Sequence, residues 1–526
     1  MHVVCKVAQR SLLRSPGDFD ISLWGTSAYS AFIVSSDKDN VDRPTARRHA
    51  TRGGSDILSL RTYTSEPGHE ARRGPPEPRG LPLIGTMLSL LIAGGGKKLH
   101  EYVDKRHRQL GPVYREQVGP VRAVFVNSPD EFRRIFRLEG TMPRHFLPES
   151  WLLYNEMRQQ RRGLLFMDGE EWLHYRRILN KLMLMPNSTD LMCGPCQEVA
   201  ESLTENWRAE SRDGATIRDL KYQLYQWSME VMLAILMGSR WSDCKQQMAP
   251  RYEYLALMVH KIFEQSVVLS MMSAKLAMRL KLSSWTKFVA TADTILDTVH
   301  IMVPELIQLG GDGLLSLMVN NGIQGEDAIR IITDFIIAAG DTSATTMQWA
   351  LLLLSGCPEL QDQLFDDIKY LSPEETTQHP LLKGVLKETL RLYPVAPFLT
   401  RYMAANNFIG DYFVRKEDLV ILSVWSSGHS AKYFPQPEEF QPERWIRMES
   451  GNYQAVNHPY GTLPFALGAR SCIGRKLAET QIYLTLAQLI KNFRIDCENR
   501  ERIKMILNMI TVPSEPIKLK MTERTV

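Results

Sequence analysis

The chain has 526 residues, with 63 basic and 59 acidic side chains, a formal net charge of +4 and 44% hydrophobic residues. This composition is typical of a folded globular protein, and it excludes a disordered chain, a collagen-like fibre and a disulfide-dense scaffold. The basic excess is too small to favour a nucleic acid as a partner. The sequence has no apolar run of the length that a bilayer-spanning helix needs, about 18 residues or more. Its seven dispersed cysteines indicate free thiols in a reducing compartment.

The first 17 residues contain Lys6, Arg10 and Arg14 among apolar residues and no acidic residue. An acid-poor, arginine-containing amphipathic start predicts a mitochondrial transit peptide, and the alternative is an unstructured tail. The chain stays polar and rich in Arg, Ser and Gly up to residue 74. We therefore expect residues 1–74 to be a transit peptide followed by a poorly ordered extension.

The folded region is expected to begin with the proline-dense segment at residues 74–82, where a helix is forbidden. Beyond it the sequence contains no internal repeat and no second linker of comparable length. Long helical patterns dominate, and short β-like runs lie between them. The sequence therefore predicts one large domain over residues 75–526, mainly α with a minor β-sheet. The clearest helical patterns are 325–357, 379–393 and 475–492, and the β-like runs are 121–127, 408–414 and 419–423.

The strongest chemical signal is the segment from Phe465 to Gly474, which reads F-x-x-G-x-R-x-C-x-G. Gly468 lets the backbone turn tightly, Arg470 supplies a cation, and Cys472 stands just before a predicted helix. The helix N-terminus should stabilise a thiolate at Cys472. Such a sulfur suits axial ligation of haem iron. The alternative for a lone cysteine is a small buried hydrophobic side chain.

This segment resembles the cysteine loop of the cytochrome P-450 family, the haem-thiolate monooxygenases, and the similarity runs from about residue 75 to the C-terminus. The resemblance implies the cytochrome P-450 fold and haem b as the cofactor. It also implies that Cys472 is the axial ligand of the haem iron and that Arg470 contacts a haem propionate. Phe465 and Gly468 are the other cofactor-binding positions of this loop.

Glu388 and Arg391 form a pair at i,i+3 within a predicted helix. Taken alone, such a pair is usually a solvated surface pair that contributes little to stability. Arg444, in Pro-Glu-Arg-Trp, resembles the family arginine that completes a buried Glu–Arg–Arg network. The resemblance therefore implies that Glu388, Arg391 and Arg444 form a structural clamp behind the cysteine loop.

A third motif, Ala-Ala-Gly-Asp-Thr-Ser at residues 338–343, lies inside a long apolar helix. Gly340 and a back-bonding Thr342 could bend this helix, and an acid beside a hydroxyl is suited to relaying protons. The alternative is a helix with an accidental polar patch. The family places this element over the haem, so the resemblance implies that Asp341 and Thr342 serve oxygen activation. Ala339 stands where the family often has glycine.

Two further haem contacts follow from the resemblance. Trp172 and Arg176, spaced i,i+4, resemble the family W-x-x-x-R helix that contacts a haem propionate. Arg401, in the segment Phe-Leu-Thr-Arg-Tyr, matches another propionate-binding position.

Lys383 and Lys387 lie at i,i+4 on the helix that carries Glu388, and Arg475 and Lys476 follow the cysteine motif directly. A solvated basic face is the simplest interpretation. Mitochondrial members of the family bind an acidic, adrenodoxin-like ferredoxin at matching positions, and basic patches steer such partners. The resemblance therefore implies electron transfer from NADPH through a ferredoxin reductase and a ferredoxin.

The stretch 267–287 combines Lys275, Arg279, Lys281 and Lys287 with many apolar residues and contains no acidic residue. Cationic amphipathic stretches of this kind can lie on a membrane surface, although packing inside the domain is an alternative. With the transit-like N-terminus, this predicts peripheral contact with the inner mitochondrial membrane on the matrix side.

Two motifs are expected to be accidental. Cys193-Gly-Pro-Cys196 spells a thioredoxin-type redox motif but lacks the strand that should precede it. The run Gly94-Gly-Gly-Lys-Lys98 lacks the first glycine and the final Ser/Thr of a phosphate-binding loop. The twelve histidines form no visible ligand cluster.

Within the family the sequence is most similar to the insect ecdysteroid 2-hydroxylases. The implied reaction converts 2-deoxyecdysone to ecdysone with one atom of O₂, the other leaving as water. Three alternatives stay open: another mitochondrial sterol hydroxylase of different regiochemistry, a reductase-independent isomerase of oxygenated lipids, and a non-catalytic sterol- or haem-binding protein. The intact Asp341–Thr342 pair argues against the isomerase. The similar stretches are 162–180, 223–231, 338–350 and 392–401.

Overall fold

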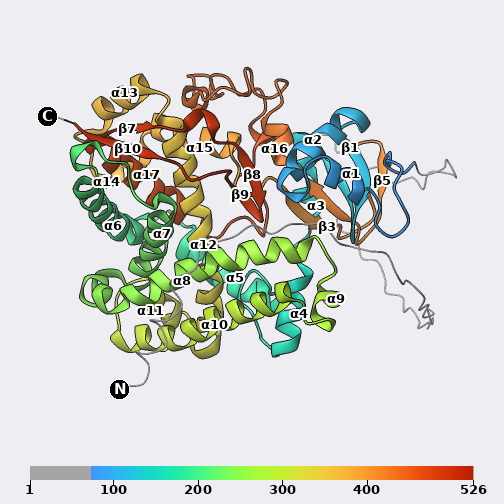
Figure 1. Ribbon diagram of the computed structural model, residues 1–526, viewed down its shortest axis with the longest axis horizontal. Coiled ribbons are helices and arrows are strands. Elements are labelled where there is room, and N and C mark those ends of the chain that lie inside the picture. Colours follow the sequence, from blue (N-terminus) through green and yellow to red (C-terminus); the bar gives the residue numbers. More distant parts are fainter. Residues whose placement is uncertain (1–72, 187, 525–526) are drawn as a thin grey trace, which may run out of the picture. The chain divides into compact units, whose positions relative to one another are not determined.

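The long apolar pattern near the middle of the sequence forms α12, Gly325–Leu354, and other elements pack on most of its surface. A helix that is apolar on nearly all sides is typical of the core of a large helical protein. The computed structural model describes residues 73–186 and 188–524, within one compact unit of the chain. The predicted transit peptide lies outside these residues. In Figure 1, α12 crosses the middle of the ribbon, between a helical part and a smaller part built around a sheet.

The remaining α-helices follow the periodic patterns of the sequence. Before α12 they are α1 Met87–Ile92, α2 Leu99–Leu110, α3 Pro129–Leu138, α4 Glu149–Arg158, α5 Gly169–Met183, α6 Ser188–Glu210, α7 Leu220–Met237, α8 Trp241–Ser270, α9 Ala274–Arg279, α10 Ser283–Leu309 and α11 Leu314–Asn320. After it they are α13 Pro358–Ile368, α14 Pro373–Gln378, α15 Pro380–Leu392, α16 Val424–Gly428 and α17 Arg475–Asn492. Short 3₁₀ turns are η2 Gly96–Lys98, η3 Arg212–Gly214, η4 Gly238–Arg240, η5 Pro442–Trp445, η6 Pro459–Gly461 and η7 Arg500–Arg502.

The largest sheet has the strand order β1-β2-β6-β3. Its β1–β2 pair is an antiparallel hairpin, β2 pairs parallel with β6, and β6 pairs antiparallel with β3. Three two-stranded pairs, β10–β7, β4–β5 and β8–β9, complete the β structure within the described residues. The strands are β1 Val113–Val118, β2 Val121–Val126, β3 Leu399–Tyr402, β4 Asn407–Ile409, β5 Tyr412–Val414, β6 Leu419–Leu422, β7 Phe493–Cys497, β8 Met505–Asn508, β9 Ile510–Pro513 and β10 Leu519–Glu523.

The main hydrophobic core surrounds α12 and includes side chains of α6, α7, α8, α10, α15 and α17. Two smaller clusters lie on the faces of the large sheet. The prediction of a mainly α domain with a minor sheet is therefore confirmed. Because α12, α15 and α17 share one core, the motifs that the sequence carries on these helices are held rigidly relative to one another.

Two boundaries differ from the sequence prediction. The helical pattern 325–357 ends at Leu354, and the β-like run 408–414 is not one strand. It falls within the hairpin formed by β4 and β5, which turns at Gly410 with φ of 56°. Glycine adopts this left-handed conformation without steric cost, so it sets the turn that splits the run.

Among the described residues, no single helix has the length and apolar composition required to cross a bilayer. Helices α10 and α11 meet that requirement only when taken together, and they are bent by 84° relative to each other.

Candidate active site

The cysteine loop is held in place by its own backbone and by a buried acid from the end of α3. The Cys472 N–H donates to the Phe465 carbonyl over 2.9 Å, and the Ala469 N–H donates to Glu139 over 2.8 Å. At Gly468, where φ is 77°, a β-carbon would lie 1.9 Å from the Glu139 carboxylate. Only glycine fits such a contact, which gives a physical reason for glycine at this position of the loop.

Cys472 lines a cavity of about 250 Å³, and residues of the cysteine loop and of α12 both contribute to its wall. The cavity wall from α12 includes Thr342 and Thr346, so the sulfur and the Thr342 hydroxyl face one enclosed space. Most of the lining is apolar. The lining residues are Met183, Met232, Phe335, Ala338, Ala339, Thr342, Ser343, Thr346, Leu390, Val395, Ala396, Pro464, Phe465, Cys472, Ile473, Gly474, Leu477, Ala478, Gln481 and Ile482.

The expected stabilisation of a thiolate by the helix N-terminus is outweighed in the metal-free chain. Burial raises the pKa of the Cys472 thiol, although the Gly474 backbone and Arg176 oppose the rise. The helix α17 does begin directly after the motif, with Gly474 as its N-cap. A bound cation would favour the thiolate form of Cys472 and add to the effect of these local dipoles.

Helix α12 is continuous through the Ala-Gly-Asp-Thr segment, so the expected bend is not needed to present Thr342. The Thr342 hydroxyl donates to the Ala338 carbonyl over 2.8 Å and is exposed toward the cavity. Its lone pairs are thereby left to accept a hydrogen bond from the cavity side. At Gly340 a β-carbon would lie 3.2 Å from the Met229 side chain, so this glycine admits the close packing of α7.

Asp341 lies on a different face of α12 from Thr342, because successive helical residues are rotated by about 100°. Its carboxylate is 3% exposed and does not line the cavity. It faces α8, where its Oδ2 lies 3.5 Å from His260 Nδ1. Burial raises the pKa of Asp341, and His260 and Lys221 oppose the rise only in part. The sequence pattern placed the acid beside the hydroxyl, but the helix directs the two side chains into different surroundings.

The predicted propionate contacts form a rim of cations beside the cysteine loop. Arg176 donates to the Ser471 carbonyl over 2.6 Å, and the Arg470 guanidinium lies 4.4 Å from the centre of the buried Trp172 ring. Arg401 instead pairs with Glu139. Burial lowers the pKa of Arg470 to about 10, and Arg401 and Arg176 add to that decrease although Asp168 opposes it. Arg401 and Arg470 each pair with a carboxylate, Glu139 and Asp168, whereas Arg176 has no carboxylate partner among the described residues and could bind an anion.

Two residues of this rim escaped the sequence prediction. Glu139 bridges Arg401 and the loop backbone, and His145 lies close to Arg470 and Arg401. Burial and these two arginines lower the pKa of His145 to about 3, so its ring is neutral. A single histidine or glutamate in a loop carries no spacing signal. Only the packing of the loop against β3 brings them to the site.

These side chains fit an iron porphyrin that carries carboxylate groups. A sulfur faces an apolar cavity, and cations surround the loop that carries it. Within the described part of the chain, Arg176 Nε and both ring nitrogens of His145 are buried without hydrogen-bond partners. Unpaired buried donors of this kind are costly unless a ligand satisfies them, and propionates would do so. No group of three or more metal-binding side chains occurs in the described residues.

Glu388, Arg391 and Arg444 are brought together, all fully buried. The carboxylate accepts bonds from Arg391 over 2.8 and 2.9 Å, from Arg444 over 2.8 Å and from Trp445 Nε1 over 2.8 Å. Both arginines donate their other N–H groups to loop carbonyls between residues 428 and 455. The network therefore ties α15 to the long connection that precedes the cysteine loop.

The four basic residues proposed for the partner site also meet in space. Burial raises the pKa of Glu479 on α17, and Arg475, Lys387, Lys383 and Lys476 all oppose that rise, so the carboxylate lies among them. Lys387 is only partly available, since its ammonium lies 4.9 Å from the centre of the Tyr453 ring. Lys476 donates to the Met185 carbonyl at the end of α5.

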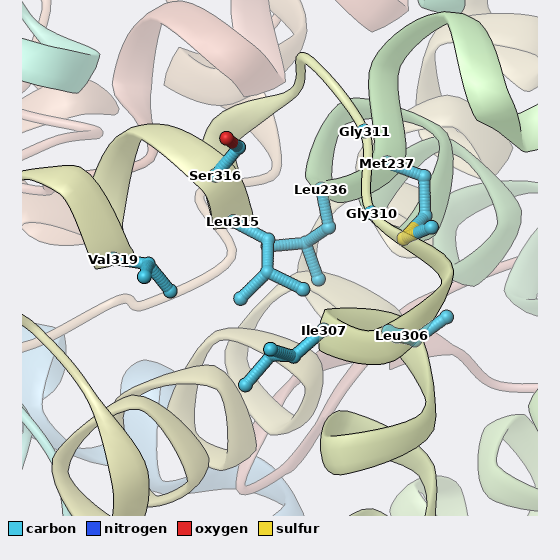
Figure 2. Close-up of a pocket in the computed structure, with 9 residues that line it drawn as sticks. All are labelled: Leu236, Met237, Leu306, Ile307, Gly310, Gly311, Leu315, Ser316 and Val319. Carbon is cyan, nitrogen blue, oxygen red and sulfur yellow. The ribbon is translucent and has the colours of Figure 1, made fainter.

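The two motifs expected to be accidental carry no site. Cys193 and Cys196 are buried inside α6, and burial raises the pKa of the Cys193 thiol to about 11. The Gly94–Lys98 run forms a turn and η2. A separate apolar cavity of about 110 Å³ lies between α7, α10 and α11, lined by residues such as Leu236, Leu306 and Leu315 (Figure 2). None of the predicted site residues lines it.

The clamp gives a stability prediction. Replacing Glu388 with Gln should lower the free energy of unfolding by about 3–5 kcal/mol, because two buried guanidinium groups lose their counter-charge. Urea denaturation followed by circular dichroism measures the change. The matched control is Glu101→Gln, which removes an exposed i,i+3 pair with Lys98 and should leave the unfolding midpoint nearly unchanged. Equal effects of the two substitutions would show that the clamp is not a source of stability.

The raised pKa of Asp341 gives a pH prediction. Above its folded-state pKa the buried carboxylate costs stability, and below the pKa of the unfolded chain, about 4, it costs nothing. Asp341→Asn should therefore raise the melting temperature near neutral pH, and the gain should shrink as the pH falls. The control on the same helix is Asp327, whose pKa is raised by burial but lowered overall by Tyr175 and Arg330. Asp327→Asn should lower the melting temperature near neutral pH, and the same sign for both variants would contradict this account.

Comparison with known proteins agrees with this geometry. Residues 75–521 match the cytochrome P450 family. The chain is 37% identical over 471 residues to Cytochrome P450 315a1, mitochondrial, of Drosophila melanogaster, covering 86% of this chain and 88% of that protein. It is 29% identical to human 25-hydroxyvitamin D-1 alpha hydroxylase, mitochondrial, covering 87% and 94%, and 27% identical to the mitochondrial cholesterol side-chain cleavage enzyme of Oncorhynchus mykiss, covering 83% and 87%. The chain belongs to the cytochrome P450 family and is a haem-dependent monooxygenase.

Proposed function

We propose that this protein is a mitochondrial steroid hydroxylase that converts 2-deoxyecdysone to ecdysone. The observation that carries the proposal is the mostly apolar cavity that Cys472 and Thr342 both line. A lipophilic substrate would lie beside α12 in this cavity. Hydroxylation at carbon 2 consumes one O₂, two electrons and two protons, and it yields the alcohol and one water.

The loop residues would hold the cofactor. Cys472 would ligate the haem iron, with Phe465 and Gly468 against the porphyrin, and Trp172, Arg176, Arg401 and Arg470 would bind the propionates. Haem with a thiolate ligand supplies the activation of dioxygen that hydroxylation requires. The apolar lining would limit the entry of water. Thr342 would donate or accept protons at the cavity wall, and Asp341 would supply them from the neighbouring face of α12.

The substrate class rests on similarity and on cavity chemistry. Of the three relatives described above, two are named for reactions on vitamin D compounds or cholesterol, and all three are named as mitochondrial. The stretches similar to insect ecdysteroid 2-hydroxylases include cavity residues. These are Ala338, Ala339, Thr342, Ser343 and Thr346 on α12, and Val395 and Ala396 after α15. This overlap supports an ecdysteroid as the substrate.

The basic cluster around Glu479 would receive the electron donor. Lys383, Lys387, Arg475 and Lys476 present positive charge around Glu479 of α17, the helix that follows the cysteine loop. An adrenodoxin-like ferredoxin, reduced by NADPH through its reductase, is acidic and would be steered to this cluster. Glu479 inside the cluster limits the positive potential.

Exposed apolar side chains support peripheral contact with the inner mitochondrial membrane. Leu91 and Ile92 of α1 are 55% and 88% exposed, and Leu276 and Leu280 near α9 are 51% and 61% exposed. The two segments adjoin, because a β-carbon at Gly96 would lie 3.0 Å from Met271 Sδ. Lysines and arginines of 275–281 flank this face and suit an anionic lipid surface.

Reconstitution tests the proposed function directly. The haem-loaded protein with ferredoxin, reductase, NADPH and 2-deoxyecdysone should form ecdysone, identified by mass spectrometry. Cys472→Ser should abolish both product and the thiolate-type carbon monoxide spectrum. Hydroxylation at another carbon would make the protein a sterol hydroxylase of different regiochemistry. NADPH consumption without product from any sterol of a panel would favour a binding protein.

The basic cluster gives a prediction for electron transfer. Lys383→Glu with Lys387→Glu should reduce ferredoxin-supported turnover and make its salt dependence shallower, because screened attraction then contributes less. Sterol binding, measured from the haem spectrum, should change little. The control is Lys97→Glu with Lys105→Glu, which alters the net charge equally on exposed residues near α2. Unchanged turnover across a salt series would identify the cluster as a solvated face only.

The Thr342 hydroxyl on the cavity wall gives a prediction for coupling, which is the amount of product formed per NADPH consumed. Thr342→Ala should leave haem content and sterol binding intact, yet lower the product formed per NADPH with hydrogen peroxide making up the difference. Positioned proton transfer is typically worth about 10²–10⁴ in rate, and the hydroxyl provides it here. The control is Thr346→Ala, one turn further along the same cavity wall, whose hydroxyl donates to the Thr342 carbonyl. Loss of coupling should be specific to Thr342, and Thr342→Ser should retain it.

A further inference from the structure

Asp341 does not line the cavity that Thr342 lines. The carboxylate is buried on the far side of α12 from the cavity lining, between α12, α7 and α8. Its Oδ1 atom has no hydrogen-bond partner within the described residues. A buried carboxylate without full hydrogen bonding is costly, and a proton that it passes on must be replaced from outside.

His260 on α8 is the group that connects Asp341 to solvent. Its Nδ1 points inward, 3.5 Å from Asp341 Oδ2, and its Nε2 points outward. Nε2 lies 2.9 Å from Lys221 Nζ and 3.2 Å from Glu264 Oε1. The imidazole is therefore placed between a buried acid and two surface charges, with one ring nitrogen for each side.

The exposed fraction of the side chain falls from Glu264 through His260 to Asp341. The Glu264 side chain is 52% exposed, His260 is 13% exposed and Asp341 is 3% exposed. Lys221, on α7, is exposed as well. The remaining titratable neighbour is Tyr225 of α7, whose ring centre lies 5.0 Å from that of His260. Burial and, next, Asp341 raise the pKa of Tyr225, so it stays neutral and does not compete for the proton.

We propose that His260 relays protons from solvent to Asp341, at the Glu264–Lys221 surface. A proton that arrives at Nε2 makes the ring an imidazolium. The Nδ1–H then passes to Asp341 Oδ2, which becomes a neutral carboxylic acid, and the ring returns to neutrality with its proton on Nε2. One proton enters at Nε2, one leaves from Nδ1 and no electrons move. Because Nδ1 is buried, rotation of the His260 side chain out to solvent then restores the tautomer that carries its proton on Nδ1. This inference rests on the proposed role of Asp341 and Thr342, and His260 is a positioning residue that acts through Asp341.

The competing account gives His260 a purely structural role, holding α8 against α12. The two accounts separate in the variant His260→Asn. Its side-chain amide can take the position of Nδ1 and donate to Asp341, but it cannot take up a proton at neutral pH. A structural contact survives this substitution, whereas a relay does not.

The decisive measurement follows the protonation of Asp341 in the haem-loaded full-length protein without substrate turnover. Light releases protons from a caged acid, and time-resolved infrared spectroscopy records the carboxylic acid C=O band, assigned by its loss in Asp341→Asn. In His260→Asn the band should appear about 10²-fold more slowly, at the lower end of the range for positioned proton transfer. His260→Gln serves as a second variant, and circular dichroism and haem content verify that both fold.

The matched control is His300→Asn on α10, which removes another partly exposed histidine beside a glutamate, 3.6 Å from Glu326. It should leave the band kinetics unchanged. A wild-type rate in either folded His260 variant overturns the relay, and so does an equal slowing in His300→Asn.

Enzyme turnover provides a second, independent test of the relay. Product per NADPH should fall to a similar extent in His260→Asn and in Asp341→Asn, and the double variant should lose no more than either, because both act on one step. Additive losses would overturn the relay. If no sterol yields product, the proposed function fails while the infrared measurement still decides the relay.

Discussion

The position of Cys472 relative to α12 is the constraint on which the rest of the structure depends. The sulfur belongs to a loop without regular secondary structure, so its location is fixed only by what holds the loop. Glu139 binds the loop backbone at Ala469, Arg176 binds it at Ser471, and α17 begins at Arg475, directly after its N-cap Gly474. The clamp around Glu388 fixes the segment that leads into the loop. A buried ionic network gains little stability over a packed apolar one, so its value here lies in fixing a geometry.

Helix α12 contacts two different environments, because the helical repeat directs neighbouring side chains to different faces. Ala338, Ala339, Thr342 and Thr346 face the cavity, whereas Gly340 and Asp341 face α7 and α8. One short motif thus supplies a hydroxyl to a dry cavity and an acid to a polar contact that leads toward the surface. The small side chain of Gly340 is part of this arrangement, since it lets Met229 of α7 approach closely.

Features that depend on local spacing were predictable from the sequence, and features that depend on tertiary packing were not. The cysteine loop, the start of α17 and the Glu388–Arg391 spacing are set by neighbours within ten residues. The meeting of Lys383 and Lys387 with Arg475 and Lys476 was predictable only through resemblance, because two helices must pack to create it. Glu139, His145 and His260 carry no spacing signal, since each contacts the site across more than eighty residues of chain. The periodicity of α12 was evident, yet the sequence did not reveal that Asp341 points away from Thr342.

Asp341 shows how function and stability are set against each other in this fold. A carboxyl that is 3% exposed, with a raised pKa and one oxygen without a partner among the described residues, destabilises the folded chain at neutral pH. Asparagine would fill the same space without a charge. Strained or uncompensated groups of this kind concentrate at functional sites. Because His260 approaches the carboxylate without closing a hydrogen bond, the acid is neither locked in an ion pair nor isolated from solvent. A group in that intermediate state can both hold and release a proton, which a fully paired carboxylate cannot.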